Sequence, residues 1–266
     1  MCYSALVRKD LDFLSEKFGA SIVRESFDEY LKAVAFDSKK YPPIENERIF
    51  PGHFAPIIYE RKGKRYIEPM RYSAFPPSFI PDPQRYTTFN ARRDNLTSKF
   101  WSEMYGKNHG VVVLRGFFEW VKVSTLLKAG VVDIKDVEAE FLRQAELRKE
   151  KILASGKKYK PTPTELKDPR FRDVVIKFSP SLHQELIVPV IFSEGDDGKG
   201  LRKGFALITD DPPKEVRSAG HDRCPVNLDD NGVDGWLRFP ISHGDINLVL
   251  DSKVSENFSH QLPRVS

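Results

Sequence analysis

The segment VVVLRGFFEWVKV (residues 111–123) is the strongest signal for the fold of this chain. It is rich in β-branched and aromatic residues, which favour an extended strand. One glycine, Gly116, interrupts the run. A glycine inside a strand marks a β-bulge or the close approach of another backbone. We therefore predict a long strand over residues 111–123 with an irregularity at Gly116.

Shorter strand and helix candidates lie on both sides of this segment. The runs 54–60 and 66–70 flank RKGKR (61–65), which predicts a hairpin. Helical spacing of apolar residues, a capping box formed by Ser26 and Glu29, and a run of helix-forming residues predict helices. The further strand candidates are 174–178, 186–192 and 204–209, and the helix candidates are 11–18, the segment after Ser26, and 136–153.

The order of these elements predicts the fold class. Strands and helices do not alternate regularly, which disfavours a doubly wound parallel sheet and favours an α+β fold with a curved, barrel-like mixed sheet surrounded by helices. The Lys- and Pro-rich stretch 157–169 is the only linker candidate, and the strands after it need partners from the first half. We predict a single domain over residues 1–266, with a helical, basic insertion around residues 124–170.

Composition limits the class of protein. The chain is 40% hydrophobic and 12% aromatic, enough for a packed core, and its longest apolar runs fall far short of the roughly 20 residues of a membrane span. The N-terminus becomes charged at once, unlike a secretory signal. Only two cysteines occur, Cys2 and Cys224, too few for a disulfide framework or a cysteine-cluster metal site. We expect a cytoplasmic protein without membrane partner, metal or cofactor.

Charge is distributed unevenly. The net charge is +4, and residues 143–177 contain eleven Lys and Arg against five Asp and Glu. Such a stretch can attract phosphate, although a charged run is more often a solvated helix and loop. The charge therefore permits nucleic-acid binding without requiring it.

The position of Cys2 points to covalent chemistry. Loss of Met1 would leave an α-amine and a thiol on adjacent carbons, and both groups titrate near neutral pH. An aldehyde condenses with the amine to an imine, and the thiol then closes a five-membered thiazolidine ring. A Met-Cys start alone is weak evidence, because it often arises by accident.

Four motifs together strengthen this interpretation. They are Met1-Cys2, Asn90-Ala91-Arg92, GFFEW at residues 116–120, and GHDRCPV at residues 220–226. In this order they resemble the motifs of the SOS-response-associated peptidase (SRAP) family. The chain departs from the family pattern at Tyr3-Ser4, Tyr72, Asp94 and Cys224; the last of these we expect to be core packing.

The resemblance implies an abasic-site crosslinking enzyme. Such proteins lose the initiator methionine and trap abasic sites in single-stranded DNA as a thiazolidine crosslink, with possible autopeptidase, lyase or crosslink-reversal activity. The implied catalytic residues are Cys2 as nucleophile, Asn90 to orient its amine, Glu119 as general acid/base, and His221 to protonate the sugar ring oxygen. By themselves, Asn90 is more typical of a strand end, and Glu119 is as easily explained by the solvent face of a strand.

The resemblance also implies a DNA-binding set. Arg92 and Arg223 would bind the phosphates that flank the lesion, since a guanidinium offers a bidentate fork. Met70-Arg71-Tyr72 stands where the family has Met-Arg-Trp, so Arg71 would contact DNA and the Tyr72 ring would stack on an exposed base. The expected partner is then single-stranded DNA that contains abasic sites. We expect a cytoplasmic, nucleoid-associated protein that is a monomer.

Two alternatives remain. An N-terminal-cysteine amidohydrolase would use the same thiol with its own amine as base, but no glycine-rich donor loop lies beside Asn90. An inactive module that binds single-stranded DNA would explain why the residues at Tyr3, Ser4, Tyr72 and Asp94 differ from the family pattern. Retention of Cys2, Asn90, Glu119 and His221 argues against it.

Overall fold

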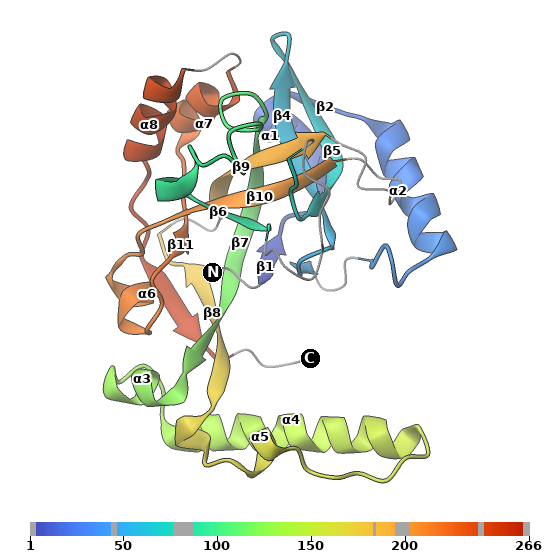
Figure 1. Ribbon diagram of the computed structural model, residues 1–266, viewed down its shortest axis with the longest axis vertical. Helices are drawn as coiled ribbons and strands as arrows, with labels where there is room; N and C mark the ends of the chain where they lie inside the picture. Colours follow the sequence, from blue (N-terminus) through green and yellow to red (C-terminus); the bar gives the residue numbers. More distant parts are fainter. Residues whose placement is uncertain are drawn as a thin grey trace.

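The strand β7 (His109–Lys122) organises a mixed sheet of twelve strands, with helices around it, in the computed structural model of the chain (Figure 1). The structure describes residues 4–43, 47–76, 88–182, 185–194, 203–238 and 242–262. The other strands are β1 (Ser4–Val7), β2 (Ala20–Ile22), β3 (Arg48–Ile49), β4 (Phe54–Arg61), β5 (Lys64–Tyr72), β6 (Asn90–Arg92), β8 (Asp173–Pro180), β9 (Leu186–Glu194), β10 (Lys203–Asp210), β11 (Cys224–Pro225) and β12 (Phe258–Gln261). The helices are α1 (Leu11–Phe18), α2 (Arg24–Phe36), α3 (Val123–Lys128), α4 (Ile134–Ala154), α5 (Pro163–Leu166), α6 (Lys214–Ser218), α7 (Asp230–Leu237) and α8 (His243–Asp251), with short 3-10 turns at Arg93–Asn95 and Pro169–Phe171.

Five strands close a ring. β7 pairs with β4, β4 with β5, β5 with β10, β10 with β9, and β9 returns to β7. Only the β5–β10 contact within this ring is parallel. The second half of β7 extends beyond the ring and pairs with β1 and β8. The predicted α+β fold with a barrel-like mixed sheet is therefore confirmed.

A bulge in β7 changes which residues face the interior. Leu6 lies opposite Gly116 and Val7 opposite Leu114, so Arg115 is the extra residue. A Cβ atom at Gly116 would come within 2.6 Å of the Phe178 carbonyl oxygen, which explains why a glycine is needed there. The predicted irregularity at Gly116 is confirmed.

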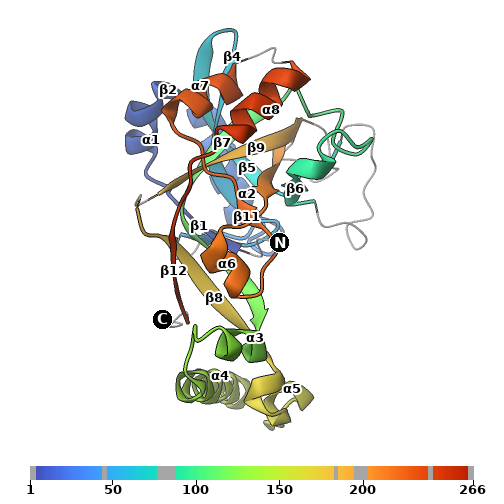
Figure 2. The same cartoon turned by 90° about the vertical axis from the view of Figure 1, so that its left-hand side faces the viewer.

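Two hydrophobic clusters show the two faces of the sheet. One cluster lies inside the ring and takes alternate residues of its strands, such as Ile57, Val188 and Leu207. The other takes the intervening residues, such as Ile58, and packs them against α1, α7 and α8. Figure 2 shows these helices beside the upper part of the sheet. The apolar content predicted from the sequence is thus divided between an interior and an outer layer.

Most of the elements expected from the sequence are present. The helix candidate 11–18 is α1, and the predicted hairpin is β4–β5, joined by a two-residue turn in which Lys62 and Gly63 both have positive φ. The capping box at Ser26 is wrong: α2 already begins at Arg24, and its N-cap Val23 has no side-chain cap. Packing of Tyr30 against Phe54 holds this helix in place.

The connection between β7 and β8 forms an arm. Lys122 lies opposite Asp173, and residues 123–172 between them contain α3, α4 and α5. Figure 1 shows α4 and α5 side by side below the rest of the molecule. The helix expected over 136–153 is α4. In the described part of the chain, no helix combines the length and the apolar character needed to cross a membrane.

Candidate functional site

Glu119 and His221 form a buried pair at the interior face of β7. Because of the bulge, Phe117 and Val121 point into the interior cluster, and Glu119 between them does so as well, with 2% of its surface exposed. The His221 Nε2 atom lies 3.1 Å from Glu119 Oε2. Glu119 is therefore not on the solvent face of the strand, where simple alternation of apolar and polar residues would have placed it.

The surroundings of this pair favour proton exchange. Burial raises the pKa of Glu119, and the hydrogen bond and charge of His221 partly lower it. The His221 Nδ1 atom lies 3.3 Å from the Arg223 carbonyl oxygen, to which a proton on Nδ1 is donated. The Nε2 atom is then left to share a second proton with the carboxyl group, as a general acid/base pair requires.

Asn90 is held by a residue that we expected to contact DNA. The Tyr72 hydroxyl donates a hydrogen bond of 3.2 Å to Asn90 Oδ1. Tyr72 is completely buried, and its ring stacks on Phe205 with the ring centroids 5.1 Å apart. Stacking on a base would need an exposed ring face, and the structure gives Tyr72 none. Tyr72 instead holds the Asn90 side chain in position through this hydrogen bond.

The two arginines expected to bind phosphate meet at one carboxylate. Arg92 is bound by Asp94 with an N–O distance of 2.7 Å, and Arg223 Nη2 lies 3.4 Å from the same carboxylate. Arg223 also pairs with Asp211 at 2.9 Å. β6 and β11 flank β10 where Arg92 and Pro225 both lie opposite Thr209. The sheet thus joins the Asn-Ala-Arg motif to the motif that contains His221.

Arg71 lies apart from this cluster. Its guanidinium donates to the Gly52 carbonyl oxygen at 3.2 Å and lies over the Phe54 ring, 4.8 Å from the centroid. These contacts join β5 to the segment before β4. A phosphate contact of Arg71 stays a prediction.

Cys2 lies outside the described residues, together with Met1 and Tyr3. The first described residue, Ser4, begins β1 and lies opposite Phe118, the neighbour of Glu119. The second cysteine, Cys224, is buried in the interior cluster, and burial raises the pKa of its thiol. Its expected role in core packing is confirmed.

Arg48 is a residue that the motifs did not indicate. Its Nε and Nη2 atoms donate to Ser4 Oγ at 3.0 and 2.9 Å, and its guanidinium lies 3.7 Å from the centroid of the Phe118 ring. It reaches this position because the two-residue strand β3 pairs with β1. No periodicity or motif in the sequence around Arg48 signals this contact.

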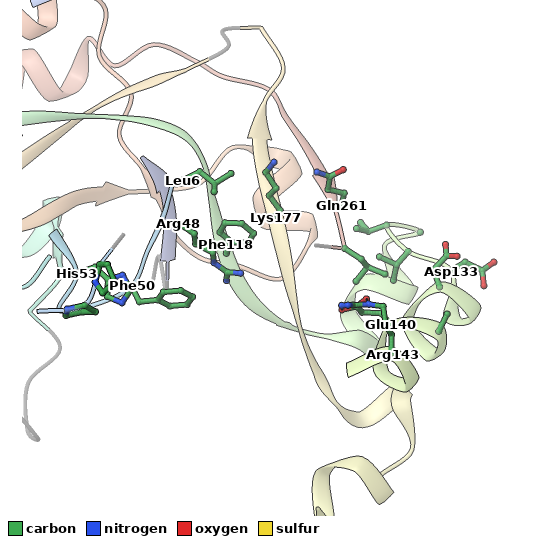
Figure 3. Close-up of a pocket in the computed structure, with 18 of the residues that line it drawn as sticks. Leu6, Arg48, Phe50, His53, Phe118, Asp133, Glu140, Arg143, Lys177 and Gln261 are labelled. Atoms are coloured by element: carbon green, nitrogen blue, oxygen red, sulfur yellow. Dashed lines mark hydrogen bonds and ion pairs between the residues drawn. The ribbon is translucent and has the colours of Figure 1, made fainter. Parts of the chain in front are cut away.

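A wide groove opens beside Arg48 and Phe118, on the face of β7 opposite Glu119. It encloses about 2010 Å³ and lies between the strands and the arm. Figure 3 shows Arg48, Phe118 and Lys177 on one side and Glu140 and Arg143 of α4 on the other. Among the described residues, no group of three or more His, Cys, Asp or Glu side chains is placed to hold a metal ion.

Three solved bacterial proteins share the fold of this chain. A protein from Bacteroides thetaiotaomicron matches with a TM-score of 0.60 at 12% identity, covering 99% of this chain and 92% of that chain. A protein from Bordetella bronchiseptica matches with a TM-score of 0.59 at 13% identity, covering 99% and 100%. A phage-related protein from Bordetella bronchiseptica matches with a TM-score of 0.52 at 15% identity, covering 82% and 81%. At these identities the matches establish the fold.

Sequence comparison supplies the family. No curated protein matches the chain significantly. The family model for "SOS response associated peptidase (SRAP)" matches residues 1–145, which is more than half of the chain and includes the first three motifs. The chain therefore belongs to the SOS response associated peptidase (SRAP) family.

Proposed function

We propose that this protein binds single-stranded DNA and, after loss of Met1, captures abasic sites through Cys2 as a thiazolidine crosslink. Membership of the SRAP family suggests a role with DNA in the SOS response. The observation that carries the finer proposal is the buried Glu119–His221 pair, with its 3.1 Å contact, next to the strand that leads from Cys2. This pair supplies the proton transfers that the crosslink needs.

Chain length keeps Cys2 near the pair. Cys2 precedes Ser4 by two residues, and an extended chain advances at most about 3.6 Å per residue, so the two Cα atoms lie within roughly 7 Å. Ser4 lies opposite Phe118 in the sheet, and Glu119 follows Phe118. The chain length therefore allows an amine on Cys2 to come within side-chain reach of the carboxyl group.

The reaction is a condensation without an oxidant or reductant. The Cys2 amine adds to the C1′ aldehyde of the ring-opened sugar, and the carbinolamine loses water to give an imine. The thiol sulfur then bonds to the same carbon, and the thiol proton ends on the nitrogen. One water leaves, and one C–N and one C–S bond replace the carbonyl bond.

Each site residue has one task in this scheme. Glu119 takes a proton from the attacking amine and returns it to the leaving hydroxyl, which a raised pKa favours. His221 donates a proton to the ring oxygen when the sugar opens. Asn90, fixed by Tyr72, orients the amine without protonating it.

DNA binding needs no base recognition in this proposal. Arg92 is half exposed, and its carboxylate partner Asp94 is 59% exposed. Exposed ion pairs are weak, typically about 0–1 kcal/mol, so a phosphate can replace the carboxylate. Arg92 and Arg223 would then hold two phosphates around the lesion, and the aldehyde itself would provide the specificity for damage.

The test compares protein with and without Met1. Each form is mixed with single-stranded DNA containing one abasic site, and denaturing electrophoresis with mass spectrometry detects the products. We expect a heat-stable adduct at Cys2 from the processed form, unchanged in Cys224→Ala because that thiol is buried, and absent in Cys2→Ala. Absence of an adduct from the processed protein refutes the proposal. Amide hydrolysis by that form would then identify an N-terminal-cysteine amidohydrolase.

A further inference from the structure

The arm, residues 123–172, accounts for the net charge of the molecule. It contains twelve Lys and Arg and eight Asp and Glu, a net charge of +4, which equals that of the whole chain. Within the arm, residues 133–142 are acidic, with four acidic residues against one lysine. The distal part, residues 143–172, has ten basic and four acidic residues. The positive charge is thus concentrated at the far part of the arm.

The arginines of the arm hold its segments together. Arg148 of α4 pairs with Glu165 of α5 at 2.7 Å, and Glu165 also completes a capping box with Thr162. Arg172 lies over the Phe141 ring, 4.6 Å from its centroid, and donates to the Lys167 carbonyl oxygen at 2.7 Å. These contacts fix α4 against the returning chain, so the arm presents an ordered surface.

The lysines of the arm are arranged differently. The last turns of α4 and the following loop carry five lysines, and all five are exposed. None of them forms an ion pair with another residue that the structure describes. They are Lys149, Lys151, Lys157, Lys158 and Lys160, and we call them the lysine cluster. A single exposed lysine is ordinary, but five lysines within twelve residues, against one exposed carboxylate at Glu150, form a strongly positive surface.

The lysine cluster lies further along α4 than the residues that line the groove. α4 has 21 residues and is therefore about 31 Å long. The N-terminal half of α4 forms one side of the groove, and Arg48 and Phe118 lie on the opposite side (Figure 3). The lysine cluster begins in the last turns of α4, and Figure 1 shows that one end of α4 lies near α3 and the other far from it. The groove thus connects the start of β1 with the arm.

We infer that the lysine cluster binds the phosphate backbone of double-stranded DNA that flanks the single-stranded stretch with the lesion. This inference rests on the proposed function. Surfaces for single strands combine cations with exposed aromatic rings, but the aromatic residue within the cluster, Tyr159, is only partly exposed and has the Arg148 guanidinium 5.4 Å from its ring centroid. Duplex DNA presents one phosphate charge per roughly 1.7 Å, which suits a surface of lysines alone. The length of α4 corresponds to about nine base pairs.

The test separates binding from crosslinking. DNA with a tetrahydrofuran abasic analogue, which has no aldehyde, is prepared as a bare single strand and with a duplex on its 5′ or 3′ side. Fluorescence anisotropy at several salt concentrations measures the affinity of three proteins. These are the wild type, a variant with Gln at all five positions of the lysine cluster, and a control with Gln at five exposed lysines outside the arm, Lys17, Lys32, Lys62, Lys64 and Lys107.

We expect one duplex-flanked DNA to bind the wild type roughly tenfold or more tightly than the bare strand, with a steeper salt dependence. The lysine-cluster variant should bind flanked DNA no more tightly than the bare strand, and the slope of log K against log salt should become less steep by about four. The control variant should keep the tighter binding of flanked DNA and the steep slope. The inference is overturned if the lysine-cluster variant and the control bind flanked DNA with equal affinity. It is also overturned if the lysine-cluster variant loses as much affinity for the bare strand as for flanked DNA. Adduct formation on a bare strand with a natural abasic site tests the proposed function separately.

Discussion

Glu119 shows how burial makes a single carboxyl group suited to acid/base chemistry. It lies between two interior residues, Phe117 and Val121, and shares a proton site with His221 at 3.1 Å. Burial penalises its charged form, and this raises its pKa. A carboxyl group with a raised pKa holds a proton more readily than an ordinary one, which favours a role as general acid/base. The consequences can be measured as rate and as stability.

Glu119→Gln should abolish proton exchange while preserving the fold. We expect crosslink formation to slow by roughly 10²-fold or more, measured by gel-based time courses on abasic DNA. A raised folded pKa contributes stability that is present below the ordinary carboxyl pKa and is lost as pH rises. The wild type should therefore lose stability relative to Glu119→Gln as pH rises above about 4.5 in urea unfolding. Unchanged crosslinking by this variant would contradict the role of Glu119.

Tyr72 provides a second test at the residue scale. Tyr72→Phe removes the hydroxyl that donates to Asn90 and keeps the ring packed on Phe205. We expect unfolding free energy to fall by about 1 kcal/mol and crosslinking to slow several-fold, with DNA affinity unchanged. A large loss of DNA affinity with normal crosslinking chemistry would instead return Tyr72 to the binding surface.

At the scale of elements, the bulge in β7 determines which side chains enter the interior. Before it, Val112 and Leu114 belong to the interior cluster; after it, Phe117 and Val121 do. The change from even to odd positions follows from the extra residue Arg115. Without the bulge, Phe118 would face inward and Glu119 outward.

Gly116→Ala tests this feature. The added Cβ would lie 2.6 Å from the Phe178 carbonyl oxygen, and β8 would have to move. We expect a loss of about 2 kcal/mol or more in unfolding free energy, and slower crosslinking, because β7 carries Glu119. Gly244→Ala in α8 is the control: a Cβ there has an ordinary 3.7 Å contact, and Ala favours a helix. Equal stability of the two variants would contradict the close-approach argument.

The arm also contacts the site at its base. Gly220 has φ +89°, and a Cβ there would lie 2.7 Å from Thr125 Cγ2 of α3. Gly220→Ala should displace the next residue, His221, and lower the crosslinking rate roughly tenfold or more, with DNA affinity little changed. Adding Thr125→Ser, which removes the clashing methyl group, should restore part of the rate. No recovery in the double variant would show that backbone strain alone is responsible.

At the scale of the whole molecule, a buried histidine joins the ring to its outer helices. His109 of β7 stacks on Trp236 of α7 at 4.1 Å, and its Nδ1 lies 3.1 Å from the Trp236 carbonyl oxygen. Its Nε2 accepts from the Gly106 backbone N–H at 3.0 Å. Burial lowers its pKa to about 4, so the folded protein holds a neutral imidazole there.

This histidine predicts acid sensitivity. The unfolded chain binds a proton at His109 below about pH 6.5, and the folded one only below about 4. Stability present above pH 6.5 should therefore be lost as pH falls toward 4, by about 3 kcal/mol for this residue. Urea unfolding of His109→Gln should show a smaller loss over that interval than the wild type. The exposed His243→Gln serves as control, and identical pH profiles of all three would contradict the prediction.

The sequence alone was enough to predict the main elements and the class of fold, and it pointed to covalent chemistry at Cys2, which stays a proposal. The runs that became β4, β5, β7, β8, β9 and β10 were readable because β-branched and aromatic residues favour strands, and Gly116 marked the bulge. The motifs singled out Glu119 and His221. These signals are local in the chain, or follow from order along it, and so need no knowledge of packing.

Which residues contact one another depends on the tertiary structure. The Glu119–His221 and Tyr72–Asn90 contacts join residues 102 and 18 positions apart, and Arg48 reaches Ser4 across 44 positions. Short strands such as β6 and β11 exist because β10 supplies their partners, so their own sequences carry no signal. The alternation of residues along β7 also predicted the wrong face for Glu119. The one-residue bulge exchanges the interior and exterior positions of the residues that follow it. Closure of the ring, a long-range event, is what turns the separate motifs into one site.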